Sequence, residues 1–200
     1  MTNVVFDVGN VLIRWDARLV YRDDFSTDAE IDAFLSHIGF GPWNLEQDRG
    51  RTWDEAVALK SAEFPEHASL IHKFHTNWHD AVPGAIPEGV EALSLVQDLG
   101  GPVYGITNFS AEKWAECQER FDFLNGFTDV VVSAHERLIK PDPAIFELFL
   151  SRNGLKAEDC LFIDDSAANI ATADQLGFDT IHLTDPKCLI GKLRVRGVLQ

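Results

Sequence analysis

The strongest constraint on the fold is a set of five short apolar runs, each of which stops at a polar residue. The runs span residues 3–6, 103–106, 130–132, 160–163 and 180–183, and the residues that follow them are Asp7, Thr107, Ser133, Asp164 and Thr184. Apolar runs of this length without alternation are typical of strands buried on both faces, as in a parallel sheet. The pattern therefore predicts a five-stranded parallel sheet.

Helical patterns occupy the segments between these runs, at residues 87–99, 110–121, 141–152 and 166–176. Gly100, Gly154 and Gly177 follow three of them, where glycine commonly ends a helix. Alternating strands and helices predict an α/β fold, with a doubly wound (Rossmann-like) parallel sheet covered by helices.

The interval between the first two runs is too long for an ordinary connection. About 95 residues lie there, whereas a strand–helix connection normally takes fewer than about ten. Thr27 and Thr52 are each followed three residues later by Glu, which is the capping-box signature of a helix start. A third helical stretch covers roughly residues 67–80. We expect an inserted helical cap domain over residues 17–83, and a core domain made of residues 1–16 and 84–200.

Charge and hydropathy restrict the partners. The chain has 17 Lys and Arg against 32 Asp and Glu, a formal net charge of −15, which argues against binding the phosphate backbone of nucleic acid. The apolar runs fall far short of the roughly 20 residues of a membrane span. No basic region precedes an apolar stretch at the N-terminus, so we expect no secretory signal and a soluble, cytoplasmic protein. Three widely spaced cysteines predict neither a disulfide framework nor a cysteine metal site. A monomer and a homodimer are equally compatible with the sequence.

Polar side chains gather at one edge of the expected sheet. Ligands of open parallel sheets bind beyond the carboxyl ends of the strands. In this chain those ends carry an acid, a hydroxyl with an amide, and an acid pair, and a lysine stands at a helix start nearby: Asp7, Thr107 with Asn108, Asp164 with Asp165, and Lys140.

This combination suits phosphoryl chemistry. Asp7 could attack phosphorus and form an aspartyl-phosphate, which splits hydrolysis into two steps. Because two anions repel, a cation has to bridge them, and Mg²⁺ binds through one or two carboxylates, here Asp165 with Asp164 beside it. Lys140 could neutralise the phosphoryl oxygens, and Thr107 with the backbone N–H groups after it could hold the others. We therefore predict an Mg²⁺-dependent phosphatase that acts on a small phosphorylated metabolite.

Four motifs in order resemble the haloacid dehalogenase-like superfamily. They are Phe-Asp-Val-Gly-Asn-Val-Leu at residues 6–12, Ile-Thr-Asn at 106–108, Lys-Pro at 140–141 and Phe-Ile-Asp-Asp-Ser-Ala-Ala-Asn at 162–169. The first motif is most similar to the sugar-phosphatase branch that includes the α-glucose-1-phosphate phosphatases. The resemblance implies that Asp7 is the nucleophile, that Thr107 and Lys140 bind the phosphoryl group, and that Asp165 and the backbone carbonyl of Gly9 bind Mg²⁺.

One position departs from the pattern of the superfamily. Most of its phosphatases carry a second Asp two residues after the nucleophile, as general acid and base, where this chain has Gly9. Losing a general acid costs about 10²–10⁴-fold when the leaving group needs its proton. We therefore expect a preference for acidic leaving groups, such as those of anomeric sugar phosphates, aryl phosphates or acyl phosphates. Asn10 or a cap residue could compensate in part.

The cap offers weaker signals. Residues 42–50 resemble the specificity loop of the superfamily, and Trp43, Asp48 and Arg49 could contact a sugar or a carboxylate. With equal weight, Arg49 could cap a helix and Trp43 could pack in the cap core. His72, His75 and His79 fall at helical spacing, and a polar helix face is favoured there over a zinc site.

Two other functions remain open. A 2-haloacid dehalogenase would use Asp7 to attack carbon without a metal, which agrees with Gly9 but leaves the Asp164–Asp165 pair unexplained. A non-catalytic ligand-binding protein on the same scaffold is the lesser alternative, and the retention of Asp7, Lys140 and the acid pair weighs against it.

Overall fold

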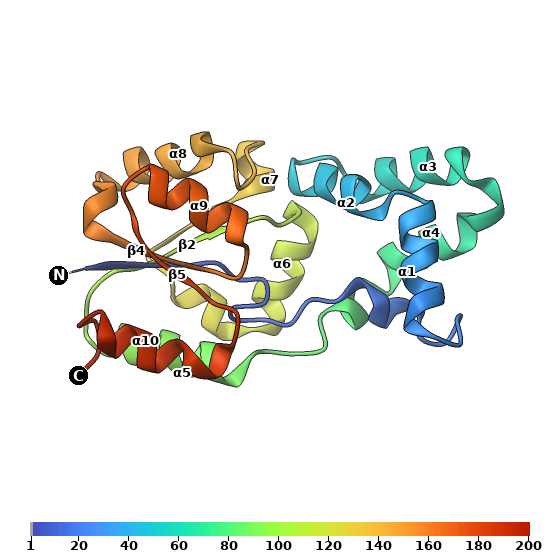
Figure 1. Ribbon diagram of the computed structural model, residues 1–200. Coiled ribbons are helices and arrows are strands. Elements are labelled where there is room, and N and C mark those ends of the chain that lie inside the picture. The colour runs from blue at the N-terminus through green and yellow to red at the C-terminus, as the bar shows by residue number, and fades with distance from the viewer. Residues whose placement is uncertain (1) are drawn as a thin grey trace.

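The computed structural model describes residues 2–200, which form two lobes (Figure 1). One lobe holds a five-stranded sheet in the order β3-β2-β1-β4-β5 in which every pair is parallel. The strands are β1 Asn3–Phe6, β2 Val103–Thr107, β3 Asp129–Val132, β4 Cys160–Asp164 and β5 Asp179–His182. Each lies within one residue of the bounds expected from its apolar run, and the α/β, Rossmann-like fold is confirmed.

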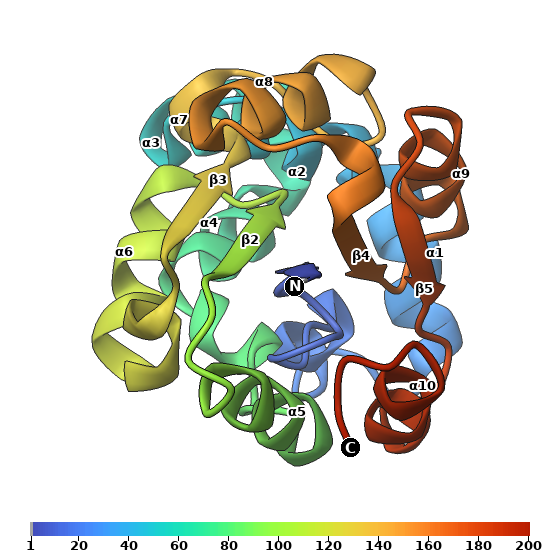
Figure 2. The same cartoon turned by 90° about the vertical axis from the view of Figure 1, so that its left-hand side faces the viewer.

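Helices cover both faces of this sheet (Figure 2). They are α5 Pro87–Gln97, α6 Ala111–Arg120, α7 Ser133–Glu136, α8 Pro143–Asn153, α9 Ala167–Gln175 and α10 Leu189–Val195. Val5 of the central strand packs with residues of α8 and α9, whereas its neighbours Val4 and Phe6 pack on the opposite side with α5, α6 and α10. Both faces of β1 are therefore buried, which is why its sequence is apolar without alternation.

The second lobe is helical and lies between β1 and α5 in the sequence. We call it the cap lobe; its helices are α1 Asp28–His37, α2 Phe40–Asp48, α3 Trp53–Glu63 and α4 Ala68–Thr76. Short 3₁₀ segments accompany the two lobes at Ala17–Tyr21, Pro65–His67, Trp78–Ala81, Asp122–Gly126, Ala157–Asp159 and Pro186–Cys188. The cap helices all fall within residues 17–83, and we propose that segment as the inserted domain.

Local sequence explains the cap helices well. Thr27 and Glu30 form a reciprocal capping box at the start of α1, and the Thr52 hydroxyl accepts a hydrogen bond from the Glu55 N–H at the start of α3. The interior of the lobe is an aromatic cluster in which Phe74 contacts the rings of Trp43 and Trp53. Trp43 thus packs in the cap core, and its indole N–H donates to the Ala56 carbonyl.

The expectation of one helix over residues 67–80 is wrong. Helix α4 ends at Thr76, whose hydroxyl donates back to helix carbonyls and to the side chain of Asn77; such local bonds compete with helix propagation. His72 and His75 therefore lie in α4, while His79 lies in the next 3₁₀ segment and pairs with Glu116 of α6 at 2.9 Å. The three histidines do not share one helix face.

Within residues 2–200, no helix combines the length and the apolar character that crossing a bilayer requires.

Candidate active site

Asp7 stands where β1 ends and a tight turn begins. Its backbone N–H donates to the Ile163 carbonyl at 2.8 Å, which continues the pairing of β1 with β4, and its carboxylate accepts from the Val8 N–H at 2.7 Å. Asn10 adopts a left-handed conformation with φ 54°, which asparagine tolerates well, and its side-chain oxygen accepts from the Trp15 N–H. The turn holds the Asp7 carboxylate at the carboxyl edge of the sheet.

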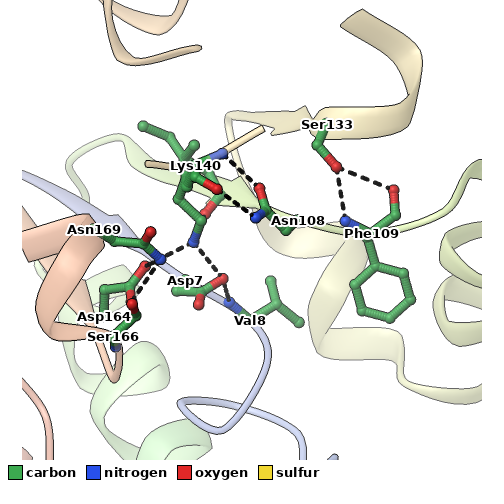
Figure 3. Close-up of polar contacts among 10 residues, drawn as sticks. Asp7, Val8, Asn108, Phe109, Ser133, Lys140, Asp164, Ser166 and Asn169 are labelled. Atoms are coloured by element: carbon green, nitrogen blue, oxygen red, sulfur yellow. Dashed lines mark hydrogen bonds and ion pairs between the residues drawn. The ribbon is translucent and has the colours of Figure 1, made fainter. Parts of the chain in front are cut away.

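Lys140 is the central cation of the site (Figure 3). Its ammonium lies 2.8 Å from the Asp7 carboxylate and 2.7 Å from the Asp164 carboxylate, and it donates to the Ile106 carbonyl at 2.9 Å. The side chain is 1% exposed, so these partners replace its water shell. Lys140 thus links the ends of β1, β2 and β4.

Asn108 holds the backbone of this lysine. Its side-chain oxygen accepts from the Lys140 N–H at 2.8 Å, and its side-chain nitrogen donates to the Lys140 carbonyl at 2.9 Å (Figure 3). The sequence suggests Asn108 as a phosphate-binding residue. The geometry instead commits its amide to positioning Lys140, although the residue also borders the cavity described below.

The two adjacent aspartates have different surroundings. Asp164 is fully buried and accepts hydrogen bonds from Lys140, from the Ser166 N–H at 2.7 Å and from Asn169 at 3.0 Å to each oxygen. Asp165 is partly exposed and borders the cavity. Asp164 therefore anchors the lysine and the turn from β4 to α9, while Asp165 keeps its carboxylate available to a ligand. Sequence reasoning assigned no role to Asn169, although it belongs to the fourth motif.

The site carries more negative charge than Lys140 can balance. The pKa of Asp7 is raised to about 7: burial and the nearby carboxylates of Asp164 and Asp165 raise it, and they outweigh the lowering effect of Lys140. Burial and the Asp164 carboxylate likewise raise the pKa of Asp165. Three carboxylates around one ammonium leave an excess of about two negative charges when all are ionised, which is costly away from water.

This carboxylate cluster fits a divalent cation. Asp7, Asp164 and Asp165 each offer an oxygen, and these oxygens lie within 4.8 Å of one another. Carboxylate oxygens are preferred ligands of Mg²⁺, and a double positive charge would offset the excess. Gly9, whose carbonyl the sequence suggests as a further ligand, borders the same cavity.

Thr107 supplies an unused hydroxyl at the end of β2. Among the buried side-chain polar atoms of residues 2–200, Thr107 Oγ1 and His75 Nδ1 are the two without a hydrogen-bond partner. Leaving a buried polar atom unpaired costs about 1–3 kcal/mol. A ligand oxygen at this strand end would satisfy the hydroxyl, which agrees with the expected phosphoryl-binding role of Thr107.

A cavity of about 170 Å³ opens above these residues, between the two lobes. Asp7, Gly9 and Asp165 form its floor, and Asn44 and Asp48 reach it from α2 of the cap lobe. The aromatic side chains that border it come from both lobes, and they are Trp15, Trp53, Trp78 and Phe109. The cavity is thus a small compartment with a charged floor and a largely apolar wall.

The sequence matches the family of haloacid dehalogenase-like hydrolases over residues 19–183. The chain belongs to this family.

The curated proteins that this chain is similar to differ in name and function. Acyl-CoA dehydrogenase family member 10 of Mus musculus is 25% identical, with 95% of this chain and 18% of that protein covered. Sesquiterpene phosphatase astK of Aspergillus oryzae is 29% identical over 56% of this chain and 58% of that protein. (S)-2-haloacid dehalogenase 4A of Burkholderia cepacia is 23% identical, with 65% of this chain and 56% of that protein covered. The chain spans less than two thirds of the length of these curated relatives.

Solved structures share the fold of this haloacid dehalogenase-like hydrolase. A family enzyme from Bacteroides thetaiotaomicron, solved with magnesium and inorganic phosphate, has a TM-score of 0.68 at 23% identity and covers 90% of this chain and 93% of that one. A dehalogenase solved with an intermediate has a TM-score of 0.72 at 17% identity and covers 98% of this chain and 96% of that one. The expected superfamily and fold are therefore confirmed.

Arg49, the cap residue suggested for substrate binding, does not border this cavity. It is the C-cap of α2, and its guanidinium lies 3.5 Å from the Glu46 carboxylate. Residues four apart share a helix face, whereas adjacent residues are rotated by about 100°. Asn44 and Asp48 therefore face the cavity together, and Arg49 points elsewhere.

Contacts between the lobes were not readable from the sequence. The Trp53 indole N–H donates to the Ser110 hydroxyl at 3.0 Å, and the Trp53 backbone N–H donates to the Glu112 carboxylate at 3.2 Å. Gly50, with φ 100°, passes so close to Ala134 of α7 that a Cβ there would lie 2.8 Å from the Ala134 carbonyl oxygen. These contacts seat the cap lobe directly on the site.

Proposed function

We propose that this haloacid dehalogenase-like hydrolase cleaves the phosphoric monoester of a small metabolite, with Mg²⁺ as cofactor and Asp7 as nucleophile. The observation that carries the proposal is the cluster of Asp7, Asp164 and Asp165 around the single ammonium of Lys140. This charge imbalance suits a divalent cation and a phosphoryl group. It does not suit a lone organic anion.

Asp7, Asp165, Lys140 and Thr107 each have a part in this reaction. An Asp7 carboxylate oxygen attacks phosphorus, so that a new P–O bond forms and the ester P–O bond breaks. Water then cleaves the aspartyl-phosphate, which releases inorganic phosphate and restores Asp7. Lys140 and the Thr107 hydroxyl hold phosphoryl oxygens, together with the N–H groups at the start of α6. When bound by Asp7, Asp165 and the Gly9 carbonyl, Mg²⁺ would lower the repulsion between nucleophile and substrate.

The cavity limits the leaving group to a small one. Its volume of about 170 Å³ is close to the roughly 150 Å³ of a cavity that accepts one benzene molecule. One sugar or aryl ring fits this space, and the aromatic wall can pack against its face. Gly9 carries no acid, so with the core lobe alone the enzyme would favour acidic leaving groups, such as those of anomeric sugar phosphates, aryl phosphates or acyl phosphates.

Two relatives support the phosphatase assignment. The Aspergillus oryzae protein is a sesquiterpene phosphatase, and the Bacteroides thetaiotaomicron enzyme was solved with magnesium and inorganic phosphate. The dehalogenases among the relatives support the alternative of 2-haloacid hydrolysis, which Gly9 also favours. The carboxylate cluster weighs against it, because a haloacid carboxylate would meet Asp7, Asp164 and Asp165 with only Lys140 to offset them.

The deciding experiment measures hydrolysis of p-nitrophenyl phosphate with Mg²⁺ and with EDTA, for the native chain and for Asp7→Asn. We expect turnover that needs both Mg²⁺ and Asp7, while exposed Asp122→Asn serves as the matched control and retains activity. If the chain releases halide from 2-haloacids and EDTA does not affect this release, the assignment changes from phosphatase to dehalogenase. Phosphate binding without any turnover would support the non-catalytic alternative.

A further inference from the structure

The core lobe leaves a gap at Gly9, where a side chain would have room. Gly9 borders the cavity beside Asp7, and a Cβ added there would meet no heavy atom within 4 Å. The position is therefore open towards the reaction space and carries no proton donor. An acid for the leaving group has to come from another element.

Asp48 is a carboxylic acid that the cap lobe places in this space. It ends α2 and borders the same cavity as Asp7 and Gly9. Asn44, one helical turn earlier, borders the cavity as well, so this face of α2 is turned towards the site. Because Gly50 has no side chain, the backbone just after α2 can approach Ala134 of α7 closely. This contact places the end of α2 against the core lobe.

The Asp48 carboxyl group is not engaged by protein partners. Among residues 2–200, no hydrogen bond or ion pair reaches its oxygens, although the residue is partly buried. The two arginines beside it are occupied: Arg49 pairs with Glu46, and Arg51 donates to the Gln47 side chain and the Trp43 carbonyl. A buried or partly buried carboxyl group without a partner is free to act on a ligand.

Other charged groups around Asp48 are also accounted for. Of the residues that border the cavity with it, Asp7 and Asp165 titrate, and the Lys140 ammonium is held by Asp7 and Asp164. Helix α7, which packs against α2, contributes Glu136, which pairs with Arg152, and the exposed His135. Its C-cap, the exposed Arg137, lies beside Gly50. The other charged residues that border the cavity with Asp48 are therefore both carboxylates, Asp7 and Asp165.

We propose that Asp48 is the general acid and base of this enzyme, supplied by the cap lobe in place of the side chain missing at Gly9. The proposal rests on the phosphatase function proposed above. In the first step the Asp48 carboxyl proton goes to the ester oxygen as the P–O bond to it breaks, and the product leaves as an alcohol. In the second step the Asp48 carboxylate takes a proton from water as the water oxygen bonds to phosphorus and the Asp7–phosphorus bond opens. Asp48 is then protonated again.

The electrostatics of the cavity agree with this role. Burial raises the pKa of Asp48 to about 7, and the neighbouring Asp7 carboxylate contributes to the rise. General acids and bases work best when their pKa lies near the operating pH. Near neutral pH a substantial fraction of Asp48 is protonated and can donate.

The test compares two aryl phosphates of similar shape, p-nitrophenyl phosphate with a good leaving group and phenyl phosphate with a poor one. Three variants are measured with Mg²⁺: Asp48→Asn, which keeps the shape and removes the acid, Asp48→Glu, which keeps the acid, and Glu46→Gln as the matched control. Glu46 lies on the same helix, is exposed and pairs with Arg49. Thermal unfolding checks that each variant is folded.

We expect Asp48→Asn to lower kcat/KM for phenyl phosphate by about 10²–10⁴-fold and for p-nitrophenyl phosphate by less than about tenfold. This contrast arises because kcat/KM reports the steps up to release of the first product, and nitrophenolate leaves without a proton. The same variant should release a burst of nitrophenolate, since water attack on the aspartyl-phosphate loses its base. Asp48→Glu should retain part of the activity on phenyl phosphate, and Glu46→Gln should behave as the native chain.

Equal losses on both substrates, or no loss on either, would overturn the role of Asp48 and leave the phosphatase function standing. If the native chain shows no phosphate hydrolysis that depends on Asp7, the phosphatase function is overturned, and the role of Asp48 falls with it. If Asp48→Asn does not fold, the native chain still decides the question across a series of aryl phosphates. A shallow dependence of kcat/KM on the leaving group's basicity supports proton donation, and a steep one overturns it.

Discussion

The indole N–H of Trp53 donates a hydrogen bond of 3.0 Å to the hydroxyl of Ser110, and both residues are buried. Trp53 opens α3 of the cap lobe, and Ser110 is the N-cap of α6 in the core lobe. Both border the cavity above Asp7. This bond ties the position of the cap to the helix start that is proposed to hold the phosphoryl group.

A double-mutant cycle measures this link. Trp53→Phe removes the donor and keeps an aromatic ring, and Ser110→Ala removes the acceptor. We expect urea unfolding to show a coupling energy of about 0.5–1.5 kcal/mol between the two changes, because each single change already breaks the same bond. We also expect kcat/KM for p-nitrophenyl phosphate to fall in both single variants, with little further loss in the double variant. Strictly additive effects would show that the bond does not couple the lobes.

A glycine at position 50 should be required for the cap lobe to pack against the core lobe in the observed arrangement. Its φ of 100° is unfavourable for other residues, and a Cβ would lie 2.8 Å from the Ala134 carbonyl oxygen. We expect Gly50→Ala to displace the end of α2 and to lower kcat/KM by at least about tenfold, as a strain of about 1–3 kcal/mol would do. Gly41→Ala within α2 is the control, since a Cβ there meets nothing within 4 Å. Unchanged activity in Gly50→Ala would show that the seated cap is not the active arrangement.

A carboxylic acid introduced at position 9 should take over the proposed role of Asp48 as proton donor. The space beside Gly9 accepts a Cβ without a clash, and a carboxyl group there would reach into the cavity shared with Asp7. In the Asp48→Asn background we expect Gly9→Asp to raise kcat/KM for phenyl phosphate by at least about tenfold. The rate for p-nitrophenyl phosphate should change less. A further loss on both substrates would argue that position 9 cannot serve the leaving group in this cavity.

Without Mg²⁺, the pH dependence of the free energy of unfolding should reflect the titration of Asp48. Its pKa is raised from 3.8 to about 7 by burial and by Asp7. Between these values the unfolded chain is ionised at this residue while the native chain keeps the proton, so the residue's contribution to the free energy of unfolding falls as pH rises. Asp48→Asn removes that dependence.

Urea unfolding at pH 5 and pH 8 tests this sign. We compare the free energy of unfolding of Asp48→Asn with that of the native chain at each pH. The difference, variant minus native, should be about 1–2 kcal/mol more positive at pH 8 than at pH 5, after allowance for the partial exposure of the residue. Glu46→Gln should show no comparable difference, because Glu46 is an exposed partner of Arg49. A relative gain that is larger at pH 5 would contradict the raised pKa.

The sequence by itself determined the sheet and the residues at its edge. The apolar runs before Asp7, Thr107 and Asp164 are local patterns, and parallel pairing necessarily brings the ends of adjacent strands together. For that reason the convergence of Asp7, Thr107 and Asp164 could be expected before any distance was known. The capping signals at Thr27 and Thr52 are equally local, and the helices begin where they indicate.

The tertiary structure alone decided how the cap completes the site. Arg49 and Asp48 are neighbours in the chain, and the orientation of α2 on the core lobe determines which of them faces Asp7. The Trp53–Ser110 bond spans 57 residues, and the bonds from Asn108 to the Lys140 backbone span 32. Contacts over such distances depend on how two packed lobes meet. Local periodicity and spacing contain no information on that arrangement, because it is set by side-chain packing across the interface.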